Sequence, residues 1–572
     1  MKEFVKNNLK TPLKGRRVLA LLLAVLMLTA VVAATASCES ASPPVTTAGE
    51  ETTAEPSPTE TTGAETGEET EGETHAHAFS DYTVVAAPTC TMTGVEKRVC
   101  ADCGEAEERE IPMAAHSYLN GICAVCGAKD PSDPLYGLSY QKSVCVLYWA
   151  DVETPEFDSG MATSNVERAI YKRNMATRDR LGLTEIVFDG CKGNANHTAE
   201  FVECLRNDIS SGAVKYDAVA GYSRTMAFCA VEGLLADLAT VEDSYLDLSQ
   251  SYWKPAGEEL LIGDSLYYLT GEISSNFYMM LYALFCNTDI VTELSLTDPT
   301  ALVTGKKWTV EAFQKMTEGL YLEQDGDNVP SSGDRYGFVS DQLHIESFLH
   351  GAGFRLTERG EEEALCVTRD LSHATLYTLV VSLTELCGSK DAALSGGEEI
   401  FVSGNALFAQ NRLYFADRKL DRAEFDWTIL PLPMYDEKQD GYRTTVGNPF
   451  TLYGISKGTD AERRLMGTAF LESMARDSAL LIAPAVLAEN LPKEMTEREA
   501  LFLVESLTAI REGVVLDHGR IFPKEKMGMT MIDLFSLSIV KDLDYVEQMK
   551  DALPTLKSRL SQILADIKAN NA

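Results

Sequence analysis

The sequence predicts an α/β domain built on a parallel sheet, and three observations support this prediction. From about residue 135 to the end of the chain, apolar runs alternate with amphipathic segments. The apolar runs 143–151, 184–190 and 216–223 have the length of buried strands, and the segments between them repeat apolar residues at helical spacing. Because consecutive strand, helix and strand segments require crossover connections, the three strands are expected to lie parallel in one sheet.

The length and charge of the chain restrict its organisation and its partners. It has 572 residues, 45% of them apolar and 24% charged, which predicts a globular protein of two to four domains. The formal net charge of -36 repels phosphate backbones and anionic headgroups. We therefore expect no nucleic acid partner and no polybasic attachment of the folded part to a membrane.

Residues 1–37 are typical of an export signal. Basic residues before position 18 precede the apolar run 18–34, and the sequence TASC ends at Cys38. This resembles a bacterial lipoprotein signal peptide, in which the cysteine is lipidated and becomes the mature N-terminus. Thr35 stands where such signals usually have leucine, so a simply cleaved signal or an uncleaved anchor is the alternative. We expect the protein on the extracellular face of the cell membrane.

Residues 38–74 predict a spacer. They consist of Glu, Thr, Pro, Ser, Gly and Ala with almost no large apolar side chain. Such a segment cannot bury enough apolar surface to offset the entropy of ordering, so it is expected to be disordered. Its acidic residues extend it by repulsion, which would hold the following domains away from the surface.

Residues 75–130 predict a small Cys/His module that resembles a zinc ribbon. Two C-x-x-C-G turns lie 19 residues apart, and such turns bring two thiolates to one cation. We expect a structural Zn²⁺ with the four ligands Cys100, Cys103, Cys123 and Cys126. A second or alternative site could use His77, Cys90 and His116. Because the segment is exported, disulfides are the competing interpretation. The module is similar to short Cys/His repeats in exported proteins of anaerobic Gram-positive bacteria.

Candidate ligand contacts come from the ends of the predicted strands. Ligands of open α/β sheets bind beyond the carboxyl ends of strands, where helix N-termini offer free N–H groups. Trp149 and Asp151 end the first strand, and Tyr222, Ser223 and Arg224 form a polar elbow between the third strand and its helix. Aromatic rings suit the weakly apolar faces of sugars, and Asp, Asn and Arg pair with hydroxyls.

Further segments, in order along the chain, resemble the extracellular solute-binding proteins of ABC importers, in the family with sugar- and oligosaccharide-binding members. These segments are 216–238, 264–274, 282–291, 307–316, 401–410, 427–442 and 469–477. The resemblance implies a two-lobed, type II periplasmic-binding-protein-like fold with hinge strands over residues 135–572. Lobe 1 would hold about 138–285 and 444–476, and lobe 2 about 286–443 and 477–572.

The resemblance also implies a function and the rest of a binding site. Asn448, in the sequence GNPF, would lie on the loop that returns to lobe 1, and Tyr278 and Phe354 would form the opposing wall. A sugar or oligosaccharide would be captured by hinge closure and delivered to membrane permease subunits. The chain has no H-E-x-x-H or Walker motif, so no enzyme is predicted. The alternative is a surface-tethered carbohydrate-active enzyme or glycan-binding adhesion protein.

The remaining tryptophans and cysteines have structural interpretations. Trp308 and Trp427 are expected to pack in the core, whereas Trp253 could equally be a wedge on the surface of a lobe. The seven cysteines after Cys126 are scattered, mostly in apolar runs, and are expected to be buried free thiols.

Overall fold

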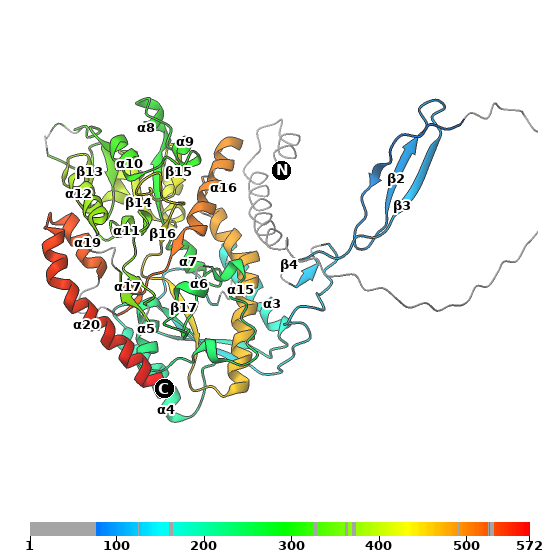
Figure 1. The fold of residues 1–572 in the computed structure, drawn as a ribbon, viewed down its shortest axis with the longest axis horizontal. Helices are drawn as coiled ribbons and strands as arrows, with labels where there is room; N and C mark the ends of the chain where they lie inside the picture. Colours follow the sequence, from blue (N-terminus) through cyan, green and yellow to red (C-terminus); the bar gives the residue numbers. More distant parts are fainter. Residues whose placement is uncertain are drawn as a thin grey trace, which may run out of the picture. The chain divides into compact units, whose positions relative to one another are not determined.

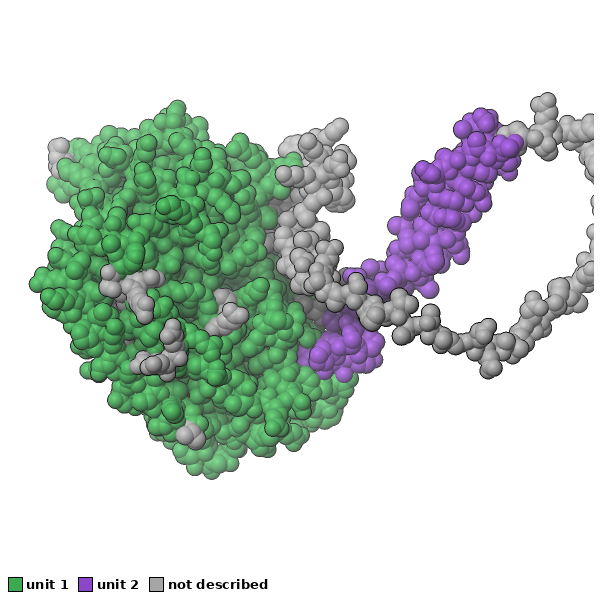
Figure 2. All heavy atoms as spheres, viewed as in Figure 1, with its two compact units in different colours: residues 1–31, 137–572 green, residues 32–136 purple. Residues whose placement is uncertain are grey.

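The computed structural model describes residues 76–572. Within this range the gaps are 120, 124, 159–163, 255, 325, 327–328, 361–363, 369–372, 490, 493–494, 524–525, 527–530 and 572. The predicted signal, Cys38 and the predicted tether lie outside the described residues. Two compact units are distinguished, one over residues 32–136 and one that includes Gly137–Ala572, shown in purple and green in Figure 2. We call their described parts the Cys/His module and the large domain.

The Cys/His module is a small antiparallel structure. Its three-stranded sheet has the order β1-β2-β3, and β4 and β5 form a separate hairpin. The strands are β1 (Thr83–Ala86), β2 (Gly94–Val99), β3 (Ala106–Ile111), β4 (Tyr118–Leu119) and β5 (Ile122–Cys123). All four residues of β1 are exposed, whereas the side chains of Cys100 and Cys123 are only 1% and 2% exposed. The module therefore has little apolar core besides its cysteine turns.

The first lobe of the large domain contains a four-stranded sheet in the order β17-β8-β6-β7. Its strands are β6 (Val144–Trp149), β7 (Ile186–Cys191), β8 (Ala218–Tyr222) and β17 (Thr451–Ile455). The first three are parallel, as predicted, and β17 pairs antiparallel with β8. The connecting helices are α3 (Asn165–Arg180), α4 (Thr198–Ser211) and α5 (Ser223–Val231). Ser164 and Glu167 begin α3 with a capping box.

The second lobe contains a five-stranded sheet in the order β13-β10-β14-β9-β15. Its strands are β9 (Tyr282–Asn287), β10 (Tyr336–Val339), β13 (Ala392–Ala393), β14 (Ala406–Arg412) and β15 (Trp427–Leu430). β10, β13 and β14 are parallel, and β9 is antiparallel to both of its neighbours. The elements of the two lobes gather at opposite ends of the large domain in Figure 1. The large domain therefore has the two-lobed α/β architecture that the sequence predicts.

Further helices and small strands complete both lobes. The helices are α6 (Ala256–Glu259), α7 (Ser275–Met279), α8 (Thr288–Glu293), α9 (Pro299–Thr304), α10 (Val310–Thr317), α11 (Ser347–Gly351), α12 (Ala374–Gly388), α13 (Gly397–Val402), α14 (Tyr414–Lys419), α16 (Glu497–Glu512), α17 (His518–Ile521) and α19 (Met531–Val540). The small strands are β11 (Thr357–Glu358), β12 (Cys366–Val367), β16 (Thr444–Thr445) and β18 (Val514–Val515). In the part of the chain that the structure describes, none of the helices combines the length and the apolar character that crossing a membrane requires.

Helix α15 (Ala461–Glu489) packs along α3 of lobe 1. The Glu489 carboxylate accepts a hydrogen bond of 2.9 Å from the backbone N–H of Asn165, at the start of α3. The predicted boundary at residue 476 therefore divides a continuous helix that stays with lobe 1. Pro484 could have ended this helix, but α15 continues through it to Glu489.

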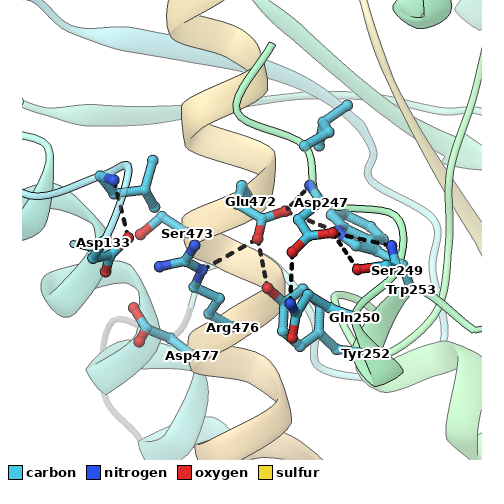
Figure 3. Close-up of polar contacts among 12 residues, drawn as sticks. Asp133, Asp247, Ser249, Gln250, Tyr252, Trp253, Glu472, Ser473, Arg476 and Asp477 are labelled. Atoms are coloured by element: carbon cyan, nitrogen blue, oxygen red, sulfur yellow. Dashed lines mark hydrogen bonds and ion pairs between the residues drawn. The ribbon is translucent and has the colours of Figure 1, made fainter. Parts of the chain in front are cut away.

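A buried carboxylate on α15 fixes an adjoining loop (Figure 3). Glu472 accepts hydrogen bonds from the Tyr252 hydroxyl at 2.5 Å and from the Trp253 indole N–H at 2.8 Å. The backbone N–H of Asp247 and the Arg476 guanidinium also donate to it. Because its side chain is fully buried, Trp253 is a core residue and not a surface wedge. Trp308 is also fully buried, as predicted, and its indole N–H donates to the Pro431 carbonyl.

The C-terminal helix α20 (Tyr545–Asn571) contacts both lobes. It packs on α12, α19 and β12 of lobe 2 and on α5 of lobe 1 (Figure 1). Near its end, the side-chain amides of Asn570 and Asn571 donate to the carbonyls of Val231 and Ala230, at the end of α5. The sequence analysis assigns α20 to lobe 2. The end of the helix, however, also contacts lobe 1.

One cysteine prediction is wrong. Cys191, at the end of β7, and Cys204, in α4, form a disulfide. The strand and the helix are consecutive elements that pack together, which brings the two side chains into contact although they are 13 residues apart. Of the other cysteines beyond Cys126, Cys145, Cys229 and Cys286 are buried thiols.

Candidate functional site

Three of the described chain segments that cross between the two lobes lie close together. The first two run side by side: Leu281 and Val446 form an antiparallel bridge, and the backbone N–H of Gly447 donates to the Met280 carbonyl at 2.7 Å. The third segment follows β18, which pairs with β16. It continues into α17, which contacts α5 of lobe 1. We refer to residues 447–450, which lead from the second crossing into β17, as the crossing loop.

The predicted elbow of lobe 1 lies against the crossing loop. At the end of β8, the backbone N–H of Ser223 donates to the Phe450 carbonyl at 2.9 Å, and its hydroxyl donates to the Asn448 carbonyl at 2.7 Å. The Arg224 Nε donates to the Arg520 carbonyl at 3.3 Å. Since Ser223 is fully buried, it anchors the loop. Arg224 and Asn448 are partly exposed and remain accessible to a solute.

Arg520 of α17 joins the third crossing to the same loop. Its Nη2 donates to the Val446 carbonyl at 3.1 Å and to the Asn448 Oδ1 at 3.4 Å, and it forms an ion pair with Glu346. Burial lowers the pKa of Arg520, but Glu346, Tyr282 and Asp517 together outweigh burial, so the pKa is raised. Its Nη1 is buried and has no hydrogen-bond partner among the described residues. The guanidinium therefore stays charged and has an unused donor beside the crossing loop.

Lobe 2 approaches the crossing loop with Arg412, the last residue of β14. A Cβ on Gly447 would lie 2.7 Å from the Arg412 Cδ, so glycine is required for this close approach. The Arg412 guanidinium donates to the Tyr414 hydroxyl at 3.1 Å, and its Nε has no partner among the described residues. Arg412 is only partly buried. The carboxyl end of a parallel strand in each lobe therefore meets the crossing loop.

The acidic residues near this position are already engaged. Glu346 pairs with Arg520. The Asp151 carboxylate, just beyond β6, accepts hydrogen bonds from the backbone N–H of Gly193 at 2.8 Å and of Asn194 at 3.1 Å, and it contacts His197 Nδ1 at 2.9 Å. Asp151 therefore holds the loop before α4. The arrangement presents hydrogen-bond donors and guanidinium groups, which suit the hydroxyls or the anionic groups of a solute.

The predicted aromatic contacts are buried. The Trp149 side chain is 2% exposed, its indole N–H donates to the Thr451 hydroxyl at 3.0 Å, and its ring centroid lies 5.7 Å from that of Tyr222. Tyr222 is itself 5% exposed. Trp149 therefore packs against Tyr222 of the elbow, and contact with a solute remains a prediction for both.

Tyr278 and Phe354 contact other residues. Tyr278 is buried beside Glu272, which pairs with Arg511; burial and the Glu272 charge raise the tyrosine pKa. Phe354 packs edge to face on Tyr435, with ring centroids 5.8 Å apart. The structure thus brings together Tyr222, Ser223, Arg224 and Asn448, with Trp149 behind them, and contact of Tyr278 and Phe354 with a solute stays a prediction.

Sequence reasoning missed Arg412, Glu346 and Arg520. Arg412 carried a signal, because it ends an apolar strand-like run in the same way that Trp149 does. Glu346 precedes α11 and Arg520 lies on the short helix α17, and their sequence neighbourhoods contain no pattern that marks an ion pair between positions 346 and 520.

The described thiols and imidazoles of the Cys/His module form two groups. In each group, one ligand atom per residue lies within 4.8 Å of the others. We name these groups site A (Cys90, His116, Cys123 and Cys126) and site B (His77, Cys100 and Cys103). The predicted shell of four cysteines is therefore wrong. The reason is that Cys90 and the Cys100–Cys103 turn lie at opposite ends of the six-residue strand β2, which spans about 20 Å at 3.3 Å per residue.

Comparison with known proteins gives structural neighbours only. No family model and no curated protein matches the chain. Among solved structures, UspC of M. tuberculosis is 16% identical with a TM-score of 0.45 over 73% of this chain and 100% of its own. A cyclo/maltodextrin-binding protein complexed with maltotetraose is 14% identical with a TM-score of 0.46 over 73% and 97%. The maltose-binding protein MalE of Listeria monocytogenes, in complex with maltose, is 12% identical with a TM-score of 0.46 over 74% and 99%.

Proposed function

We propose that the protein is the extracellular solute-binding component of an ABC importer. It captures a small polar solute, a sugar or an oligosaccharide, between the two lobes of the large domain by hinge closure, and it catalyses no reaction on it. A lipid on Cys38 anchors it to the cell membrane, and separate permease and ATPase subunits complete transport. Two of the structural neighbours were solved in complex with maltotetraose and with maltose, which belong to the class of solute that we propose here.

The observation that carries this proposal is the meeting of both lobes at the crossing loop. The end of β8 in lobe 1 holds the loop through Ser223, and the end of β14 in lobe 2 contacts it through Arg412. Ligands of open α/β sheets bind beyond the carboxyl ends of strands. A solute at this position would contact both lobes only when they are close together, so its binding energy would favour the closed arrangement.

The side chains at this position suit a hydroxyl-rich solute. Arg224, Arg412 and Asn448 are partly exposed and supply several donors and one amide acceptor. Arg418 of lobe 2 donates to the Glu153 carbonyl of lobe 1 at 2.8 Å, so the lobes also touch outside the crossing segments. A hydrogen bond to a charged group contributes about 1.5–3 kcal/mol, which is enough for these arginines to determine affinity.

The test is a thermal-shift screen of monosaccharides and oligosaccharides, followed by calorimetry on any stabilising compound. A solute at 100 times its Kd would raise the free energy of unfolding by about 2.7 kcal/mol. Arg412→Ala and Asn448→Ala are expected to weaken binding by roughly 1–3 kcal/mol each. The matched control is Arg498→Ala, because that side chain is 83% exposed on α16.

Two results would contradict the proposal. Unchanged affinity in both variants would place the solute elsewhere, and conversion of the bound sugar would favour the carbohydrate-active enzyme. A glycan-binding adhesion protein would bind the sugar but would not copurify with permease subunits. Cys38→Ala tests the anchor: it should move the protein from the membrane fraction to the medium.

A further inference from the structure

Sites A and B of the Cys/His module are built in the same way. In site A, His116 Nδ1 lies 3.4 Å from the Cys126 Sγ; in site B, His77 Nδ1 lies 3.4 Å from the Cys103 Sγ. Each histidine stacks on the aromatic residue two positions later, with centroids 5.5 Å apart in site A and 5.4 Å apart in site B. The two groups are therefore structural repeats of one Cys/His unit.

The turns that carry the cysteines are also equivalent. Phe79 pairs with Cys100 as Tyr118 pairs with Cys123, both antiparallel. The glycine after each C-x-x-C sequence has a φ near +74°, with values of 75° and 73°, and its N–H donates to the carbonyl of the first cysteine. The first cysteine of each turn is buried and the second is exposed. Both turns thus present two sulfurs and one imidazole nitrogen in the same geometry.

The spacing of these atoms fits a tetrahedral zinc ion. With Zn–S bonds of about 2.3 Å and Zn–N bonds of about 2.05 Å, tetrahedral ligands are separated by about 3.7 Å for two sulfurs and about 3.5 Å for sulfur and nitrogen. The Cys90 and Cys123 sulfurs are 3.6 Å apart, and both histidine-to-cysteine distances are 3.4 Å. A disulfide requires about 2.05 Å, and all five cysteines are thiols in this structure.

One difference separates the repeats. Cys90 supplies a fourth ligand atom to site A, whereas no fourth His, Cys, Asp or Glu joins site B among the described residues. In site B a carboxylate instead contacts the far side of the imidazole: His77 Nε2 lies 3.1 Å from the Glu105 Oε2. Carboxylates in this position orient the ring of a metal-bound histidine.

We propose that the Cys/His module binds two Zn²⁺ ions in chemically different sites. Site A encloses its ion with three thiolates and one imidazole and is a closed structural centre. Site B holds its ion with two thiolates and one imidazole and leaves the fourth position to water, so its ion exchanges with solution. Because the module has little apolar core, the ion of site A stabilises its fold.

The test uses the full-length protein, reduced and loaded with zinc without oxygen, and measures zinc per chain by mass spectrometry before and after exposure to a chelator. We expect two zinc ions, one of them released roughly tenfold or more faster than the other. His77→Ala should retain one slowly released ion, and Cys126→Ala one rapidly released ion. Cys90→Ala gives site A the ligand set of site B, so both ions should then be released rapidly.

Three controls make the result decisive. Cys366→Ser removes a thiol outside the module and should leave both ions in place; His75→Ala should do the same. If His75→Ala releases the ion of site B to the chelator faster than the wild type does, His75 contributes to that site and its fourth position is not open to water. The charge-transfer absorption of the Co²⁺-substituted protein counts five thiolates if both sites are filled. A single ion per chain that is lost in both Cys100→Ala and Cys123→Ala, or thiols that remain oxidised and bind no metal, would overturn the proposal.

Discussion

Trp149→Phe distinguishes a core role of this tryptophan from the predicted contact with a solute. The indole is buried, and its N–H donates to the Thr451 hydroxyl, which in turn donates to the Glu156 Oε2 at 2.7 Å. Tyr453 donates to the other oxygen of the same carboxylate, also at 2.7 Å. Phenylalanine keeps an aromatic ring behind Tyr222 but ends this chain of hydrogen bonds at Thr451.

Two losses determine the expected magnitude. The buried Thr451 hydroxyl loses its donor, which costs about 1 kcal/mol. The smaller ring also buries about two fewer carbon atoms, each contributing about 0.8 kcal/mol. We therefore expect Trp149→Phe to lower the free energy of unfolding by about 2–3 kcal/mol. A solute found by the sugar screen should bind within twofold of the wild-type affinity, because the indole has almost no accessible surface.

Urea unfolding of Trp149→Phe, Thr451→Val and the double variant measures this hydrogen bond as a coupling energy. A value of about 0.5–1.5 kcal/mol is expected, since the two groups touch. Calorimetry with the solute provides the second measurement. Unchanged stability together with a tenfold or greater loss of affinity would refute the reasoning and restore Trp149 to the binding surface.

Two further predictions concern buried ionisable groups. Glu472→Gln removes the charge of the α15 carboxylate that accepts four hydrogen bonds (Figure 3). In urea titrations it should lower the free energy of unfolding by roughly 3–5 kcal/mol. A change below 1 kcal/mol would show that the loop is held by packing alone. Burial lowers the pKa of His518 to about 4, so the unfolded chain, with a pKa of about 6.5, takes up a proton that the folded protein does not; stability is therefore present above pH 6.5 and is lost as the pH falls. Between pH 8 and pH 4.5, His518→Gln should lose about 2.5 kcal/mol less than the wild type, and parallel profiles would contradict this assignment.

Local patterns predict much of lobe 1, because the predicted strands and helices are short-range features. The apolar run 216–223 becomes β8, and Gly233, with a φ of 70°, lies just beyond α5. The pairing of β8 with β17 is different in kind. Thr451 lies opposite Tyr222, far away in sequence. Hydrophobic periodicity contains no information on such a partner, and only the resemblance to a protein family pointed to it.

The same limit applies to the predictions at the candidate site. Position at the end of a strand suggested that Trp149 is accessible, and Arg412 and Arg224, which have similar positions, are partly exposed. Trp149 is nevertheless buried, and its indole N–H donates to Thr451 of the distant strand β17. In the Cys/His module, the spacing of the two C-x-x-C turns predicted four cysteine ligands around one ion, whereas the structure gathers Cys and His side chains in two groups. The spacing could not show that β2 separates the turns, because strand length decides which cysteines meet.

In the proposed mechanism, the crossing loop would serve both as part of a hinge and as part of the binding surface. Asn448 is held at both ends: its carbonyl accepts from Ser223 of lobe 1, and its side chain accepts from Arg520 of the third crossing. Lobe 2 has a different relation to the loop, because Arg412 touches Gly447 by van der Waals contact and keeps its buried Nε without a partner among the described residues. Hydrogen bonds resist displacement, whereas a contact between a glycine and a long side chain can slide. The proposed closure would therefore move Arg412 past a loop that stays fixed to lobe 1, and a solute hydroxyl that binds the free guanidinium nitrogen would stabilise the closed position.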